Sequence, residues 1–327
     1  MRVICILLAN LYLSVNAFAG LTAAQHLQIE MRAQREGWVY DSHHPDYATG
    51  LLNETKKEFS YESLKDVDVD VPDELDLRDR SGPIRDQGQC GSCWAFSITA
   101  MLHDALMIKG LNDPGALSEQ YLVDCARDMY GCSGGMPSAA KWVSTPNGSP
   151  LLADYPYTAR NGRCRTGLKI AGQALEWHYV GQEGRMPQPE EIMKALVLYG
   201  PVSVTIAADG ALGGYREGVF HGRSRSINHM VDINGYSKKG GYWIMRNSWG
   251  TRWGMQGWAY VAFGANSIGT DTIFVKVKEA PPVPVIREFS VAAKNLTIKV
   301  TLKPENRGKV EDHKMTLQPF LNDLDRR

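Results

Sequence analysis

The chain has 327 residues, enough for one large domain or for two lobes that each bury a core. Its 36 basic residues equal its 36 acidic residues, so it lacks the basic field that would favour nucleic acid as a partner. Hydrophobic residues make up 43% and charged residues 22%, which is typical of a globular protein and excludes disorder of the whole chain. No apolar run after residue 20 approaches the roughly 20 residues that a membrane span requires.

The first 19 residues have the pattern of a cleaved secretory signal. Arg2 precedes an apolar stretch over residues 3–15, which is followed by Ala17-Phe18-Ala19, the Ala-x-Ala pattern of a cleavage site. The alternative, an N-terminal membrane anchor, is disfavoured because the stretch is short for a span. Cleavage after Ala19 removes Cys5 and leaves five of the six cysteines in an oxidising compartment, where cysteines tend to pair. Five is an odd number, so one free thiol has to be explained.

Residues 20–71 are polar, and a helix is predicted around Ala23–Arg35. The segment ends in an alternating acidic run over residues 66–71, which repels itself and which we interpret as a solvated, protease-accessible linker. A longer helix is predicted from Ser92 to Lys109, because apolar side chains recur there at three- and four-residue spacing and Gly110 follows. Further helices are predicted over residues 118–124, 137–144 and 189–199.

After Pro201 the pattern changes to that of strands. Apolar stretches separated by glycine-rich turns predict strands over residues 202–206, 230–233, 242–245, 258–263 and 272–277. A helical half followed by a strand half predicts an α+β protein of two lobes with a cleft between them. The proline-rich residues 280–284 interrupt this pattern, and alternation over residues 296–303 predicts one half-buried strand beyond them.

Three Asn-x-Ser/Thr sequons mark candidate glycosylation sites, at Asn53, Asn147 and Asn295. Asn295 shares its strand face with Lys299 and Lys303, so its side chain is expected to face solvent, as a glycan requires. Because such tripeptides also arise by chance, the use of each sequon stays open.

The candidate nucleophile is Cys93, which opens the helix predicted from Ser92. A helix N-terminus carries about half a positive charge, which favours the nucleophilic thiolate. Gly91 and Ser92 are small and allow a close substrate approach, and Gln87 could place a side-chain amide beside the Cys93 backbone N–H to stabilise an oxyanion. The alternative is that Cys90 and Cys93 form a redox or metal-binding pair, but a metal site would want a second nearby pair, which is absent from the sequence.

The candidate acid–base partner of this thiol is His229, which opens a predicted strand directly after a polar turn. Asn247 could accept the N–H of the other ring nitrogen and fix the tautomer, while Trp249 covers that bond from water. The remaining histidines lie in polar segments, on the predicted helix or beside strands, where a structural role is more common: His26, His43, His44, His103, His178, His221 and His313.

These residues lie in motifs that resemble those of the papain family of cysteine proteases. The matching motifs are Gln87–Phe96, Leu117–Cys125, Gly131–Gly135, Tyr155–Tyr157, Gly200–Val204 and Asn247–Gly250. They cover the chain from about Pro72 to Val277, and their number and order exclude a random match.

The resemblance implies a papain-like fold, with a helical N-terminal lobe, a β-barrel-like C-terminal lobe and the active-site cleft between them. It implies that Cys93 is the nucleophile and that His229 is the general base and later the general acid. It further implies that Asn247 orients the histidine and that Gln87 donates to the oxyanion. The reaction is then hydrolysis of peptide bonds by an endopeptidase, through a thioester acyl-enzyme on Cys93, with no metal or other cofactor.

The resemblance also implies disulfides Cys90–Cys132 and Cys125–Cys164, which leave Cys93 free. A third disulfide of many relatives is missing, since Ile268 stands where one partner is expected. The expected partners are protein or peptide substrates and cystatin-like inhibitors. We expect a monomer with an extracellular or lysosomal location at the end of the secretory route, without membrane attachment once the signal is removed.

Substrate binding is expected at residues that correspond to the family's cleft. Gly134 and Gly135 would pair with the extended substrate backbone. Further cleft residues, most of them around the S2 pocket, are expected to be Met136, Pro137, Thr205, Met230, Trp249 and Ile273. These side chains carry no charge, so an apolar or aromatic P2 residue is predicted. The alternative for Met136 and Met230 is ordinary core packing.

The predicted organisation is a signal peptide over 1–19, a pro-segment over 20–71, a protease domain over 72–279 and a C-terminal extension of unknown role over 280–327. The pro-segment is short, and how it inhibits stays open. An alternative function is that of a catalytically silent papain-fold binding protein, and a weaker one is inhibition of other proteases by the pro-segment. The silent protein is disfavoured because all four residues of the candidate site are present.

Overall fold

The computed structural model describes residues 21–54, 60–111, 113–144, 146–183, 185–279, 286–292 and 295–300. Contacts within the chain divide it into two units, and the division falls between Glu279 and Ala280. The predicted signal sequence lies outside the described residues, as do the proline-rich stretch 280–284 and residues 301–303 of the predicted last strand. Within the described part, no helix has the length and apolar character needed to cross a membrane.

The predicted helices of the first unit occur in the predicted order. They are α1 (Ala23–Glu36), α2 (Cys93–Ile108), α3 (Glu119–Cys125) and α4 (Pro189–Tyr199). The single turn α5 (Gly210–Gly213) was not predicted. Short 3-10 helices are η1 (Arg78–Arg80), η2 (Gly131–Ser133), η3 (Pro137–Trp142) and η4 (Ala265–Ser267). The helix predicted over 137–144 is thus a 3-10 helix, a form common in short connecting pieces.

The strands of the first unit form one ten-stranded sheet. They are β1 (Trp38–Tyr40), β2 (Tyr61–Glu62), β3 (Glu74–Asp76), β4 (Glu176–Val180), β5 (Val202–Ile206), β6 (Tyr215–Phe220), β7 (His229–Ser237), β8 (Tyr242–Arg246), β9 (Trp258–Ala262) and β10 (Thr272–Lys276). The strand order is β1-β6-β9-β8-β7-β5-β10-β4-β2, and β3 pairs with β7 off this path. The fold is α+β as predicted, but among the described strands the sheet is open rather than closed into a barrel.

Both ends of this strand path come from the segment before residue 72. β1 pairs antiparallel with β6, and β2 pairs parallel with β4. Neither strand was predicted from the sequence, because they contain only three and two residues, too few to show alternation. The N-terminal segment is therefore built into the two edges of the sheet.

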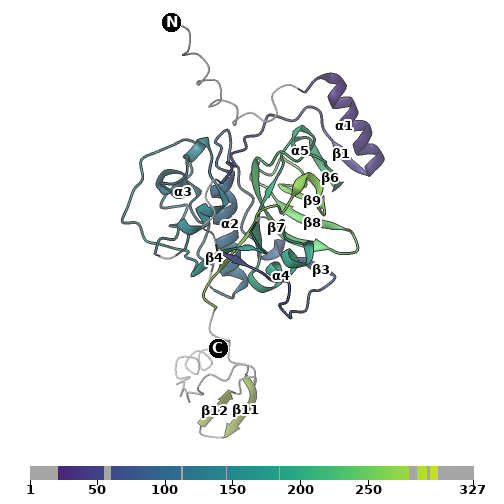
Figure 1. Cartoon of the computed structure of the whole chain (residues 1–327). Coiled ribbons are helices and arrows are strands. Elements are labelled where there is room, and N and C mark those ends of the chain that lie inside the picture. The colour runs from purple at the N-terminus through teal and green to yellow at the C-terminus, as the bar shows by residue number, and fades with distance from the viewer. Residues whose placement is uncertain are drawn as a thin grey trace, which may run out of the picture. The chain divides into compact units, whose positions relative to one another are not determined.

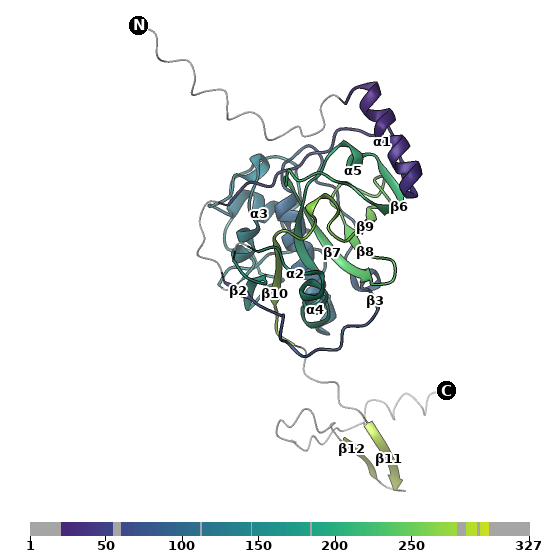
Figure 2. The same cartoon turned by 45° about the vertical axis from the view of Figure 1, so that its right-hand side comes forward.

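The central helix α2 separates the smaller helical side of the unit, which contains α3, from the sheet (Figure 1). Thirteen of its 16 residues are buried, and most of its buried apolar residues belong to one of the unit's two hydrophobic clusters. One cluster joins α2 and α3 to Met230 and Ile273 of the sheet, and the other contains the sheet with α4. α1 lies on the outside of the unit, next to β1 and β6 (Figures 1 and 2).

The acidic run over residues 66–71 is only partly the solvated linker that its sequence suggests. Its aspartates are exposed, but its valines are half-buried. Val67 and Val71 pack against the sheet's hydrophobic cluster, and their carbonyls accept hydrogen bonds from Lys194 and Lys238. The alternation was missed as a packing pattern because the charge dominates the composition of this stretch.

The second unit contains an antiparallel hairpin of β11 (Ile286–Ala292) and β12 (Asn295–Val300). β12 falls on the strand predicted over 296–303, whereas β11 was not predicted.

Candidate active site

The thiol of Cys93 lies at the first residue of α2, beside the start of β7. The side chain is fully buried, and its sulfur is hydrogen-bonded by the backbone of Met230, Trp94 and Gly50. Burial outweighs these hydrogen bonds and raises the pKa of the thiol to about 12. In this state the thiol is therefore protonated and unreactive at neutral pH.

The imidazole of His229 is held by Asn247 and covered by Trp249. His229 Nε2 lies 2.8 Å from Asn247 Oδ1, and the rings of His229 and Trp249 stack with 4.7 Å between centroids and 22° between planes. β7 begins at His229, and Asn247 directly follows the neighbouring strand β8, so one β7–β8 pair supplies both residues. His229 Nδ1 is buried and has no hydrogen-bond partner among the described residues. Burial lowers the pKa of His229 to about 4.

Gln87 is fixed close to both groups by its side chain and its backbone. Its Oε1 accepts a 2.6 Å hydrogen bond from the Ser248 hydroxyl, and its Nε2 donates to the Cys90 carbonyl at 2.9 Å. Its backbone N–H donates to the Ser248 carbonyl, next to Asn247. The structure thus brings Gln87, Cys93, His229 and Asn247 to one place between α2 and the β7–β8 pair. The supporting role of Ser248 was not recognised from the sequence.

The N-terminal segment passes directly over this place. Gly50 and Leu51 donate backbone hydrogen bonds to the Asn228 carbonyl, and Leu51 forms a parallel bridge with Gly135 that is closed by two hydrogen bonds of 2.8 Å. A Cβ on Gly50 would lie 2.0 Å from the carbonyl oxygen of Gly91, so only glycine fits at this point. The segment excludes water from the thiol and the imidazole, which accounts for both pKa shifts.

The same segment is anchored on Trp249. The ring of Tyr47 stacks on the indole at 4.6 Å, and the indole N–H donates to the Ala48 carbonyl at 3.0 Å. Trp249 is therefore enclosed between His229 and Tyr47. The sequence signal for this contact was the short run of small and apolar residues at 48–52 inside a polar segment, which we did not recognise.

The predicted substrate-binding residues lie around the same segment. Gly135 pairs with Leu51, and a Cβ on Gly134 would touch the side chain of Leu52. Leu51 packs against the hydrophobic cluster that contains Met230 and Ile273. The other predicted positions are buried at Pro137 and Thr205 and half-buried at Met136.

One ionisable group near these positions was missed. Thr205 Oγ1 lies 3.4 Å from a carboxylate oxygen of Asp271 and accepts a hydrogen bond from the Asp271 backbone. Burial and the nearby carboxyl of Glu54 raise the pKa of Asp271. Glu54 itself accepts hydrogen bonds from Ser138 N and from the Tyr179 hydroxyl. The region around Thr205 is therefore less apolar than the predicted set of residues suggests.

Both disulfides implied by the resemblance are present. Cys90 pairs with Cys132 and Cys125 pairs with Cys164, and Cys93 is free. No cluster of three or more potential metal ligands occurs among the described residues. Of the sequons, Asn53 is exposed and Asn147 is half-buried, while the side chain of Asn295 lies outside the described part.

Comparison with known proteins identifies one family. Residues 71–276 match the family model described as papain family cysteine protease. Human cathepsin O is 36% identical over 218 residues, which cover 62% of this chain and 64% of that protein, less than two thirds of its length. Cysteine proteinase 3 of Entamoeba histolytica is 33% identical over 277 residues, 81% of each chain.

Solved structures give the same result. A structure from work on the mite allergens Blo t 1 and Der p 1 has a TM-score of 0.67 and 26% identity, and covers 78% of this chain and 91% of that chain. The Carica candamarcensis cysteine protease CMS1MS2 in complex with E-64 has a TM-score of 0.56 and 32% identity, and covers 63% of this chain and 99% of that chain. The chain belongs to the papain family of cysteine proteases.

Proposed function

We propose that the protein is a cysteine endopeptidase that is synthesised as a zymogen. The observation that carries the proposal is the meeting of Cys93, at a helix N-terminus, with a His229–Asn247 pair that Trp249 covers. A thiol, a base and a third group that orients the base are the parts that nucleophilic acyl transfer requires.

In the mature enzyme, water and substrate reach the thiol once the N-terminal segment has left. His229 then takes the proton of the Cys93 thiol, and the helix dipole and the imidazolium stabilise the thiolate that forms. The sulfur attacks the scissile carbonyl carbon, and the oxyanion that forms is stabilised by the Gln87 side-chain amide and the Cys93 backbone N–H. His229 gives its proton to the leaving amine, which leaves a thioester on Cys93. Water, deprotonated by His229, then attacks the thioester and releases the carboxylate product.

An apolar P2 residue is proposed because the pro-segment already places one in the cleft. Leu51, which pairs with Gly135, packs against the cluster of Met230 and Ile273. A substrate side chain at the same position would bury its apolar surface against the same cluster. Asp271 lies close by, so this preference is expected to depend on the protonation of that carboxyl.

The zymogen proposal assigns residues 20–71 as an inhibitory pro-segment, removed to give a protease domain over 72–279 with an extension over 280–327. Its support is the segment's triple attachment, through β1 at one sheet edge, β2 at the other, and residues 47–52 over the thiol. Entry through the secretory route and glycan attachment remain part of the proposal.

The test is peptide hydrolysis by the full chain before and after removal of residues 20–71, with Cys93→Ala as the matched control. Hydrolysis that appears on processing and is absent from the variant is the expected result. A processed protein that neither cleaves peptides nor reacts with E-64 would instead favour the catalytically silent binding protein.

A further inference from the structure

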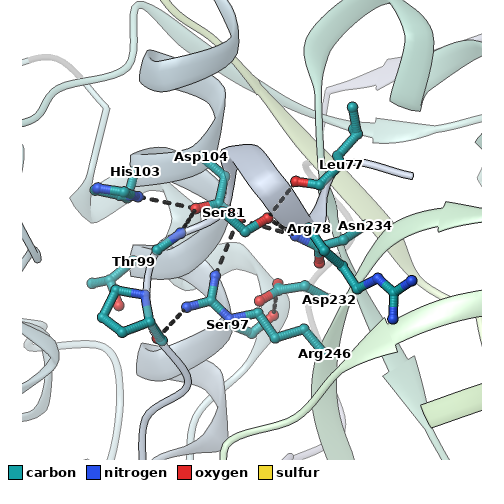
Figure 3. Close-up of polar contacts among 12 residues, drawn as sticks. Leu77, Arg78, Ser81, Ser97, Thr99, His103, Asp104, Asp232, Asn234 and Arg246 are labelled. Atoms are coloured by element: carbon teal, nitrogen blue, oxygen red, sulfur yellow. Dashed lines mark hydrogen bonds and ion pairs between the residues drawn. The ribbon is translucent and has the colours of Figure 1, made fainter. Parts of the chain in front are cut away.

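A second group of buried polar side chains lies between α2 and the β7–β8 pair, apart from the candidate active site (Figure 3). The member of this group on α2 that lies closest to Cys93 is Ser97, one helical turn after it. Its counterpart on β7 is Asp232, three residues after His229, and the Ser97 hydroxyl lies 2.7 Å from Asp232 Oδ1. Asn234 of β7 donates to Asp104 of α2 at 3.0 Å. These contacts join the helix that carries the thiol to the strand that carries the imidazole.

The charges of this group do not balance if every carboxyl is ionised. The two guanidiniums are each committed to another acid, since Arg246 lies 3.0 Å from Asp104 and Arg85 lies 3.0 Å from Glu119. The second Arg246 Nη donates to a backbone carbonyl of the loop before α2, at Pro83.

Asp232 is the carboxyl left over. It is 3% exposed and stands opposite Arg246 in the β7–β8 register, yet in the described part of the chain it has no ion pair within 4.0 Å. His103 is the remaining titratable group and bridges Asp104 and Asp113. An ionised carboxylate that is buried without a paired cation costs several kcal/mol and takes up a proton instead.

The hydrogen bonds around Ser97 also indicate that Asp232 carries a proton. Ser97 Oγ contacts three oxygens: the Ser203 hydroxyl, the Val231 carbonyl at 3.0 Å and Asp232 Oδ1 at 2.7 Å. A serine has one proton to donate, and both the carbonyl and an ionised carboxylate can only accept it. With a proton on Asp232, the acid and Ser203 both donate to Ser97, and Ser97 donates to Val231. All three contacts are then satisfied.

The electrostatics of the interface agree with a protonated acid. Burial raises the pKa of Asp232 well above its ordinary value, and the negative charge of Asp104 raises it further. Arg246 and the hydrogen bond with Ser97 lower this pKa, but their effect is smaller than that of burial.

We propose that Asp232 is a positioning residue that works in its protonated form. Its hydrogen bond to Ser97 fixes the position of α2 on β7 and thereby the position of the Cys93 thiol relative to the His229 imidazole. The proposal rests on the proposed function, because positioning matters only if these two groups react. Asp232 contacts neither of them and acts through the seating of α2 on β7.

Equilibrium unfolding tests the protonation without any reference to activity. We compare the full chain with and without Asp232→Asn, both in a Cys93→Ser background that prevents autolysis. The folded protein keeps a proton that the unfolded chain releases above about pH 4. The unfolding equilibrium constant of the parent should therefore rise by up to about tenfold per pH unit relative to Asp232→Asn, until the pH reaches the folded-state pKa of Asp232.

Asp113→Asn is the matched control, because the same substitution at this carboxyl should give a stability difference that changes with pH in the opposite direction. Hydrogen bonds from Gly115 and His103 lower the pKa of Asp113, so the parent should gain stability relative to this variant as pH rises through the carboxyl range. A parent that keeps or gains stability relative to Asp232→Asn over the same range would overturn the proposal. So would an Asp232→Asn chain that fails to fold, since the amide is the neutral isostere.

Kinetics of the processed enzyme test the positioning. Asp232→Asn keeps a donor towards Ser97, and its kcat should stay within about twofold of the parent. Ser97→Ala and Asp232→Leu remove the contact, and a misplacement of about 1 Å should lower kcat by about 10- to 100-fold with KM nearly unchanged. The rate of E-64 inactivation should fall in parallel. Equal kcat in all three variants would refute positioning while leaving the proposed function intact, and an inactive parent would refute the function while the unfolding result still stands.

Discussion

A single methyl group at residue 50 should disable inhibition by the pro-segment. The Cβ of Gly50→Ala would lie 2.0 Å from the carbonyl oxygen and 2.3 Å from the carbonyl carbon of Gly91. Gly91 cannot move aside, because its backbone N–H is bonded to the Cys132 carbonyl and Cys132 is linked to Cys90. The pro-segment must therefore lift from the cleft.

The size of the effect follows from the hydrogen bonds that hold the segment there. Gly50 N and Leu51 N donate to the Asn228 carbonyl, Leu52 N donates to the Gly135 carbonyl, and Gly135 N donates to the Gly50 carbonyl. At about 0.5–1.5 kcal/mol each, losing these four bonds weakens the closed state by about 2–6 kcal/mol. The exposed fraction of the thiol then increases about 30- to 25,000-fold.

The assay is the rate at which E-64 labels the unprocessed full-length chain, measured by mass spectrometry. Gly37→Asn is the matched control, since it changes a pro-segment glycine with open space around it and a left-handed φ of 78° that asparagine tolerates. We expect much faster labelling for Gly50→Ala and unchanged labelling for the control. A Gly50→Ala chain that is labelled as slowly as the parent would refute the account of the close approach.

Three further predictions concern the thiol, the disulfides and specificity. In the unprocessed chain, iodoacetamide should alkylate Cys93 slowly at pH 7, and the rate should rise about tenfold per pH unit towards the raised pKa of the thiol, about 12. The processed enzyme should react readily at pH 5–7. Equal rates for the two forms at pH 7 would contradict occlusion of the thiol. Replacing Cys125 and Cys164 together by serine should lower the free energy of unfolding in urea by about 3–4 kcal/mol, and an unchanged midpoint would show that this 39-residue link adds nothing. Peptides with leucine at P2, the residue type of Leu51, should have a kcat/KM at least about tenfold above those with lysine at neutral pH, and a preference for lysine would indicate that Asp271 dominates the pocket.

The sequence was sufficient to predict the parts of the site that lie within short motifs. Cys93 at a helix start and His229 at a strand start are local features, and periodicity predicts α2 and most of the central strands. The pairing of Cys90 with Cys132 followed from the resemblance and is present.

The path of the pro-segment could not be predicted, because its contacts are distant in sequence. β1 pairs with residues near 217, and Leu51 pairs with Gly135, while neither stretch is long enough to show a period. The tight approach of Gly50 to Gly91 depends on two backbones from different parts of the chain.

The polar group between α2 and β7 was hidden for a similar reason. In the sequence, Asp232 and Asn234 interrupt an apolar strand, and Asp104 interrupts an apolar helix. Each polar residue interrupts the apolar pattern of its own element. Only the packing of α2 on β7 shows that Asn234 is hydrogen-bonded to Asp104 and Asp232 to Ser97.

The central claim is that Cys93 is a nucleophile activated by His229 and silenced by the pro-segment. The most direct measurement is the stoichiometry of E-64 labelling, located by mass spectrometry, in the full chain, in the processed protein and in processed His229→Ala. The account predicts about one label per molecule on Cys93 below pH 7 in the processed protein, and little in the other two. A processed protein whose Cys93 stays unlabelled, or is labelled equally without His229, would contradict it.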